Sequence, residues 1–222
     1  MLSCLAVGKT YRSERGLVEA VRGIDLDIAA GRYAAVIGRS GSGKSSLLAM
    51  IGGLSRPTAG GIRIDGTDIW SLSDNALAHF RSQRIGYVFQ FASLLPTLRL
   101  IDNVALPALL ARRPKAVDPH GRAAELLDAV GLADHSDAYP SEMSAGEQRR
   151  AVIARALIND PVLLLADEPT SDLDEQTERE VMSHLLGAAR RHGATLVLVT
   201  HNLALAAGAE EVIQVADGKI VP

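Results

Sequence analysis

The 222-residue sequence has one cysteine, few aromatic residues and no long apolar run. The single thiol, Cys4, excludes an internal disulfide, so a reducing compartment suits the chain. Fully apolar runs such as residues 162–166 are far too short to cross a bilayer, and the N-terminus shows no basic segment followed by an apolar stretch. We therefore expect neither a membrane span nor a secretory signal.

A surplus of basic charge is also missing. The net charge is −3 and the isoelectric point is near 6.1, whereas proteins that bind DNA or RNA carry an excess of lysine and arginine. We therefore expect no nucleic-acid partner. The hydrophobic content of 47% is sufficient for a sizeable core, which predicts one large soluble unit.

Residues 38–46, here called the phosphate loop, read Gly-Arg-Ser-Gly-Ser-Gly-Lys-Ser-Ser and fit the pattern G-x-x-x-x-G-K-[ST] after an apolar run at 33–37. Its glycines let backbone N–H groups turn around an anion, Lys44 reaches the outer phosphates, and the Ser45 hydroxyl suits Mg²⁺. An ordinary glycine-rich turn is the alternative. The residues predicted to bind a nucleoside triphosphate are Gly38, Ser40, Gly41, Ser42, Gly43, Lys44, Ser45 and Ser46.

The hydrophobic pattern predicts an α/β fold: a P-loop NTPase core with a mostly parallel sheet, an N-terminal antiparallel β-subdomain and an inserted α-helical subdomain. Alternation at residues 24–28 indicates the antiparallel part. Apolar runs at 162–166 and 195–199, separated by a helical pattern, indicate the parallel part. We predict one domain, 1–222. Its core comprises 1–90 and 160–222, and its helical subdomain about 91–159.

Polar residues follow the predicted parallel strands, where ligands of such sheets bind. Asp167 is placed to hold Mg²⁺, and Glu168 to act as the general base that polarises the attacking water. His201 is a candidate donor to the terminal phosphate, and Gln90 can contact both Mg²⁺ and water. The alternatives are a pair of helix-capping acids, a structural histidine and an ordinary strand-end amide.

A capping box, S-x-x-E, stands at Ser144 and Glu147 and predicts a helix from there to about Ile158. A well-capped helix accounts for this pattern. The glycine in its first turn, Gly146, and the arginines that follow also suit an anion site. The residues alone leave both interpretations open.

Together these motifs resemble the ATP-binding subunit of an ATP-binding-cassette (ABC) transporter. The resemblance rests on the phosphate loop, Gln90, the signature segment 143–147, and residues 163–170, 171–174 and 201. It implies ATP and Mg²⁺ as cofactors, with Ser45, Gln90 and Asp167 on the metal and Tyr11 stacked on adenine. It further implies a homodimer in which Ser144 and Gly146 of one copy reach the ATP of the other, and a role for Asp174 in communication between the copies.

The signature segment departs from the family's usual Leu-Ser-Gly-Gly-Gln at Met143, Ala145 and Glu147. The methyl group of Ala145 would be strained if that position needs a positive φ, and harmless in a helix. Glu147 is expected to fold back onto the amide of Ser144.

Residues 91–98 and 102–107 are similar to the subgroup that serves lipoprotein release and macrolide-type efflux. That similarity implies a permease on a separate chain, with this subunit peripheral on the cytoplasmic face of the membrane. Leu94, Leu95, Leu98 and Leu100 would contact the permease or pack inside the helical lobe.

The alternatives are a mechanotransmission ATPase of a cell-division type complex and a methionine-like importer ATPase. A DNA- or ribosome-associated ATPase is disfavoured, because only residues 91–143 separate Gln90 from Ser144 and the chain holds one cassette. A nucleotide-binding scaffold without turnover is disfavoured by the presence of Lys44, Asp167, Glu168 and His201.

Overall fold

The computed structural model describes residues 1–13, 16–111 and 118–221. Two compact units are present. The first unit comprises Met1–Arg81 with Thr195–Pro222, and the second comprises Ser82–Ala194. The chain passes from the first to the second within helix α2 (Asp74–Arg84). The division into a core and a helical subdomain near residues 90 and 160 stays a prediction.

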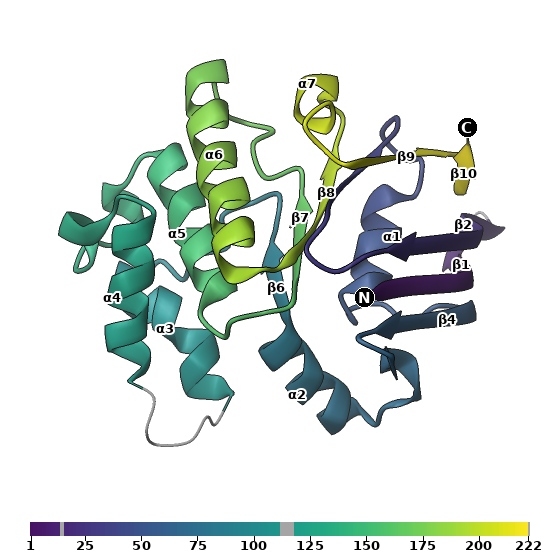
Figure 1. Ribbon diagram of the computed structural model, residues 1–222, viewed down its shortest axis with the longest axis horizontal. Coiled ribbons are helices and arrows are strands. Elements are labelled where there is room, and N and C mark those ends of the chain that lie inside the picture. The colour runs from purple at the N-terminus through teal and green to yellow at the C-terminus, as the bar shows by residue number, and fades with distance from the viewer. Residues whose placement is uncertain (14–15, 112–117, 222) are drawn as a thin grey trace. The chain divides into compact units, whose positions relative to one another are not determined.

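The first unit contains an antiparallel sheet in the order β2-β1-β4-β5. Its strands are β1 (Leu2–Ser13), β2 (Gly16–Ile28), β4 (Ala59–Ile64) and β5 (Thr67–Asp68) (Figure 1). Along β2, Ile24, Leu26 and Ile28 are buried while the aspartates between them are exposed, as expected for a sheet with one solvated face. The predicted antiparallel β-subdomain is confirmed.

Parallel strands form the other part of the first unit. Strand β3 (Tyr33–Ile37) pairs in parallel with β8 (Thr195–Thr200) on one side and β9 (Glu211–Ala216) on the other, and β10 (Lys219–Val221) pairs antiparallel with β9. Residues 34–36 are buried, which explains the continuous apolar run. The helices of this unit are α1 (Lys44–Ile51), η1 (Ile69–Ser71) and α7 (Leu203–Ala206).

The second unit joins a parallel strand pair, β6 (Ile85–Val88) and β7 (Leu163–Asp167), to a group of helices (Figure 1). These are α3 (Leu100–Leu110), α4 (Pro119–Ala129), η2 (Ala133–His135), η3 (Pro140–Glu142), α5 (Ala145–Leu157) and α6 (Glu175–His192). Buried residues of α3, α4 and α5 form the core of this group. The α/β fold class with its helical insertion is confirmed.

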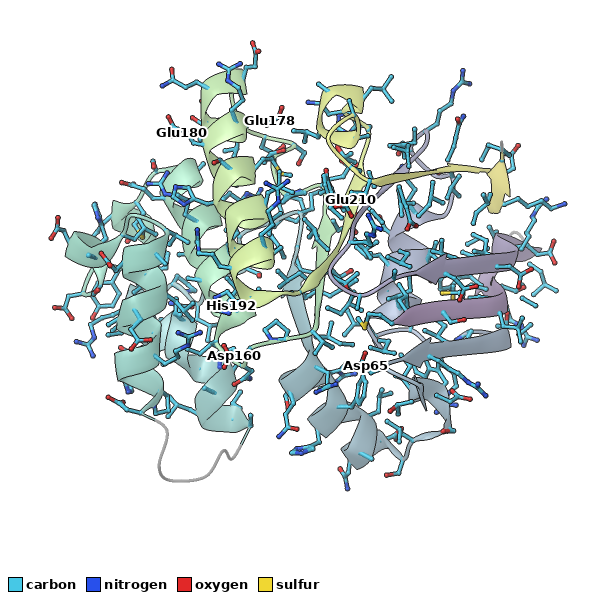
Figure 2. All side chains as sticks on the ribbon, viewed as in Figure 1. Asp65, Asp160, Glu178, Glu180, His192 and Glu210 are labelled. Atoms are coloured by element: carbon cyan, nitrogen blue, oxygen red, sulfur yellow. The ribbon has the colours of Figure 1, made fainter. Side chains whose placement is uncertain are left out.

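Helix α6 makes polar contacts near both of its ends. Near its C-terminal end, His192 Nδ1 lies 3.6 Å from Asp160 Oδ1, and Arg122 Nη2 donates to the same oxygen at 2.8 Å (Figure 2). Near its N-terminal end, Glu178 Oε2 accepts a hydrogen bond from Thr170 Oγ1 at 3.0 Å. The Thr170–Glu178 bond holds the segment that follows β7 against the helix, and Asp160 holds the other end of the helix to the segment before β7.

None of the helices within 1–13, 16–111 and 118–221 combines the length and apolarity needed to span a bilayer. The thiol of Cys4 lies in β1 and is 2% exposed. Burial, together with the charges of Asp27 and Asp25, raises its pKa to about 12. The thiol is therefore protonated at neutral pH and unreactive.

Candidate nucleotide site and signature helix

The phosphate loop leads from β3 into α1, and its backbone depends on glycine. Gly38, Gly41 and Gly43 have φ values of 154°, 78° and 106°. A Cβ atom at Gly43 would lie 2.2 Å from the carbonyl oxygen of Ala20, and one at Gly38 would lie 2.2 Å from that of Val215. Only glycine fits at these two positions without a shift of the backbone.

Lys44 is the first residue of α1 and is 5% exposed. Its Nζ donates hydrogen bonds to the carbonyl oxygens of Gly38 at 2.8 Å and Arg39 at 2.9 Å, so its ammonium group lies folded over the loop. The N-cap residue, Gly43, supplies no side-chain cap, and the first turn of α1 holds no acidic residue. The N–H groups at this helix end therefore suit an anion.

An open cavity of about 700 Å³ lies beside the loop within the first unit. His201, which follows β8, lines it together with Leu203, loop residues 37–42 and the β9–β10 segment 214–217. The Ser42 hydroxyl is buried and has no hydrogen-bond partner within the described part of the chain. A buried hydroxyl without a partner next to loop amides fits a phosphate group, because phosphate oxygens would satisfy both.

Tyr11 lies close to the same helix. Its Oη donates a hydrogen bond to Ser46 Oγ at 3.4 Å, and its ring is 40% exposed. Lys9 Nζ lies 5.0 Å from the ring centroid, two residues earlier in the same strand. An exposed ring at this place offers a flat face to a base.

In the second unit, Asp167 is the last residue of β7, and Glu168 follows it directly. Glu168 has a φ of 43°, a left-handed conformation that costs a non-glycine residue about 1–3 kcal/mol. The N–H of Ser171 donates to the Glu168 carbonyl oxygen at 3.3 Å and closes the turn. Strained residues of this kind cluster at functional sites, so the backbone marks Glu168 as a candidate functional residue.

Gln90 follows β6 and is exposed. Arg149 of α5 is 5% exposed; it donates to the carbonyl oxygen of the preceding Phe89 at 3.2 Å, and its Nη2 lies 3.6 Å from Asp172 Oδ2. Burial lowers the pKa of Arg149, and the Asp172 charge partly opposes that effect. This arginine links the strand end before Gln90 to the segment after β7, and no spacing in the sequence indicates that link.

Helix α5 begins as the capping box predicts, with Ser144 as the N-cap residue. The Ser144 N–H donates to Glu147 Oε2 at 2.8 Å, so Glu147 does fold back. Ala145 is the first helical residue and is not among the residues with positive φ. The methyl group at this position is therefore compatible with the backbone, and the departure from glycine creates no strain.

Gly146 allows α5 to approach α6. A Cβ atom there would lie 2.6 Å from Cγ2 of Thr177. The Thr177 hydroxyl donates to Asp174 Oδ2 at 2.6 Å, and Asp174 Oδ1 accepts from the N–H groups of Gln176 and Thr177 as the N-cap of α6. These bonds, that of the Thr177 hydroxyl first, lower the pKa of Asp174. Asp174 thus has a capping function besides the one predicted for it.

The predicted site residues divide between the two units. The phosphate loop, Tyr11 and His201 meet in the first unit. The second unit holds Gln90, Ser144, Gly146, Asp167, Glu168 and Asp174, of which Gly146 and Asp174 meet through Thr177. The roles assigned to these residues stay predictions.

Three comparisons with known proteins identify the family. Residues 21–171 match the family model described as ABC transporter. The chain is 45% identical to the lipoprotein-releasing system ATP-binding protein LolD of Geobacter metallireducens, over all of this chain and 98% of that protein. It is 42% identical to the macrolide export ATP-binding/permease protein MacB of Rhodopirellula baltica, over 99% of this chain and 32% of that longer protein.

A solved structure gives the same answer. The fold matches a dimeric ATP-binding cassette in a post-hydrolysis state bound to ADP and Pi, with a TM-score of 0.92, 36% identity, and coverage of 100% of this chain and 97% of that one. The chain belongs to the ABC transporter family and is an ATP-hydrolysing subunit of it.

Proposed function

We propose that this chain drives a membrane permease of the lipoprotein-release or efflux type, encoded on a separate chain, through ATP-dependent closure of two copies. One observation carries the proposal. The phosphate loop, with its unsatisfied Ser42 hydroxyl, and His201 line one open cavity of the first unit, and the buried Lys44 lies folded over the same loop. The subunit works as a peripheral protein on the cytoplasmic face of the membrane.

The binding of ATP follows from these donors. The phosphates lie against the loop amides and the N-terminus of α1, where Lys44 exchanges its bonds to Gly38 and Arg39 for phosphate oxygens. Ser42 gains the partner that it lacks. The adenine stacks on the exposed ring of Tyr11. His201 donates to the terminal phosphate.

Hydrolysis needs a metal and a base. Ser45, Gln90 and Asp167 offer hydroxyl, amide and carboxylate oxygens, the ligand types that suit Mg²⁺, which neutralises charge on the phosphates when bound. Glu168 accepts the proton of the attacking water. Its position in a tight turn directly after β7 supports this role, because the turn fixes the carboxylate at the strand's carboxyl end.

Each ATP lies between the phosphate loop of one copy and Ser144 and Gly146 of the other. The relative whose solved structure matches is dimeric, which supports pairing. Within the second unit, Gly146 touches Thr177, and Thr177 bonds to Asp174. Asp174 therefore lies two contacts from Gly146, the residue proposed to reach the partner's ATP, and is suited to communicate its presence.

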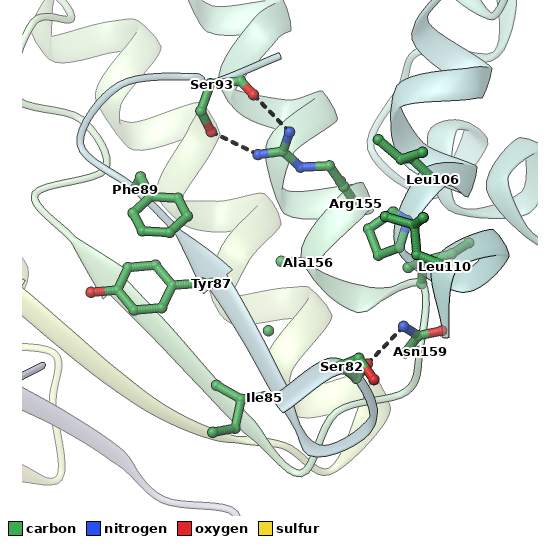
Figure 3. A pocket seen from close by; sticks show the side chains of 13 residues that line it. Ser82, Ile85, Tyr87, Phe89, Ser93, Leu106, Leu110, Arg155, Ala156 and Asn159 are labelled. Atoms are coloured by element: carbon green, nitrogen blue, oxygen red, sulfur yellow. Dashed lines mark hydrogen bonds between the residues drawn. The ribbon is translucent and has the colours of Figure 1, made fainter. Parts of the chain in front are cut away.

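The permease docks on the second unit at an apolar cavity of about 410 Å³ (Figure 3). Leu106 and Leu110 of α3, with Tyr87 and Phe89 at the end of β6, supply its apolar wall; Leu110 is 72% exposed. Arg155 also lines it and donates to Ser93 O and Ser93 Oγ, both at 2.8 Å. The guanidinium of Arg155 places a positive charge at this cavity, which suits a partner segment that carries an acidic residue.

The leucines proposed as permease contacts differ in exposure. Leu95 is 44% exposed and open to a partner, whereas Leu100 is fully buried. Leu100 therefore packs inside the helical lobe, which is the alternative that the sequence left open. Leu94 and Leu98 are half-buried.

Leu110→Asp should abolish co-purification with the permease while basal ATP turnover of the isolated subunit stays within about two-fold, because the change adds a charge only to the docking cavity. Leu5→Asp is the matched control, since Leu5 lies in β1 and is 71% exposed. The measurement is capture from solubilised membranes by a tag on the subunit. Equal recovery of the permease with both variants would rule out this docking surface.

A further inference from the structure

The hydroxyl proton of Ser144 is already committed to a hydrogen bond. Ser144 Oγ lies 2.7 Å from Glu147 Oε2, and the N–H of Glu147 donates back to Ser144 Oγ at 3.3 Å. A serine hydroxyl has one proton, and an ionised carboxylate can only accept. The proton therefore points at the carboxylate of Glu147, in the first turn of the helix that Ser144 caps.

Several groups keep Glu147 ionised and in place. The Ser144 hydroxyl, and then the Ser144 N–H, lower the pKa of Glu147, and the charges of His135 and Arg150 act in the same direction. His135 Nε2 lies 3.5 Å from the other carboxylate oxygen, Oε1. Glu147 is therefore held as an ionised acceptor, with Oε2 bonded to the hydroxyl and the N–H of Ser144 and Oε1 beside His135.

This arrangement opposes the contact proposed for Ser144. A phosphate oxygen of ATP is also an acceptor, so Ser144 can bind it only by turning its proton away from Glu147. We propose, on the basis of the function proposed above, that Glu147 is a positioning residue. It keeps the Ser144 hydroxyl proton directed at its own carboxylate, an arrangement called here the Ser144–Glu147 lock. The lock raises the ATP concentration at which two copies pair.

Glu147→Gln weakens the lock without removing the cap of helix α5. The amide oxygen of the new side chain still accepts from the Ser144 N–H, so α5 stays capped. A neutral amide oxygen holds the hydroxyl less strongly than a carboxylate, because charge-assisted bonds are about twice as strong as neutral ones. Glu147→Gln should therefore lower the ATP concentration for half-maximal pairing by about three- to ten-fold.

The test uses the full chain with Glu168→Gln, in which ATP is bound and not consumed. ATP is titrated, and the dimer fraction is measured by analytical ultracentrifugation. Glu142→Gln is the matched control. Glu142 caps the preceding turn in the same way, because its side chain accepts from the Tyr139 N–H at 2.7 Å. No serine hydroxyl takes part in that bond. We expect a lower half-maximal ATP concentration for Glu147→Gln, none of this gain for Glu142→Gln, and unchanged melting temperatures for both.

Ser144→Ala separates this inference from the function on which it rests. We expect Ser144→Ala to raise the ATP requirement and to remove any gain from Glu147→Gln in the double variant. If Ser144→Ala changes nothing, the role of Ser144 across the dimer fails first and the lock fails with it. If Ser144→Ala weakens pairing but Glu147→Gln brings no gain, or brings the same gain without the serine, the lock alone is overturned.

Discussion

Glu168→Gln is expected to reduce ATP turnover at least about 100-fold and to leave ATP-driven pairing of two copies intact, because a positioned general base contributes about 10²–10⁴ in rate. An amide has nearly the volume of the carboxylate, so the turn after β7 keeps its backbone, but an amide cannot accept the proton of water. The measurement is steady-state phosphate release, together with the dimer fraction at saturating ATP.

The control for this change is Glu175→Gln. Glu175 stands in the first turn of α6, its side chain is 84% exposed, and its Oε1 lies 2.6 Å from Arg179 Nη1. Loss of this ion pair in Glu175→Gln should leave ATP turnover within about two-fold of the unmodified chain, since exposed ion pairs contribute little to stability. Turnover at the unmodified rate in Glu168→Gln would remove Glu168 from the base role, whatever the control shows.

Lys44→Ala is expected to weaken ATP binding by about 100-fold, since bonds to charged groups contribute about 1.5–3 kcal/mol each. The loss has two causes. The change removes the ammonium group that lies over the loop, and the carbonyl oxygens of Gly38 and Arg39 lose the donor that now holds them. The measurement is a titration with a fluorescent ATP analogue, with circular dichroism to confirm an intact fold.

An exposed lysine provides the comparison for this variant. Lys219 lies exposed in β10 of the same unit and does not line the loop cavity, so Lys219→Ala removes the same charge from outside the proposed site. It should bind the analogue as the unmodified chain does. Unchanged affinity in Lys44→Ala would mean that the loop does not hold phosphates, and the proposed function would lose its main support.

Local patterns made much of this fold predictable. The apolar run before the phosphate loop is β3, the run before Asp167 is β7, and the Ser144–Glu147 cap begins α5. Helix α6 ends as its sequence indicates, with Gly193 at a φ of 62°. Each of these features depends on residues close together in the chain, where strand period, cap chemistry and glycine's conformational freedom act directly.

The features that could not be predicted depend on distant residues. Part of the lining of the loop cavity comes from segment 214–217, which β9 brings beside β3. Arg149 bonds to Phe89 and pairs with Asp172, residues from two different strand ends. Gly146 is needed because Thr177 of another helix lies against it. The composition of one segment says nothing about neighbours that only the folded chain supplies.

The central claim is that ATP binds between two copies, and trapped ATP in mixed dimers tests it most directly. Two tagged chains, both carrying Glu168→Gln, are combined in two ways: Lys44→Ala on one chain with Ser144→Ala on the other, or both changes on the same chain opposite an otherwise unchanged partner. If each site joins the loop of one copy to Ser144 of the other, the first mixture keeps one intact site and traps one ATP per dimer, and the second traps none. One ATP in the second mixture and none in the first would show that each copy holds its ATP alone and would contradict the account.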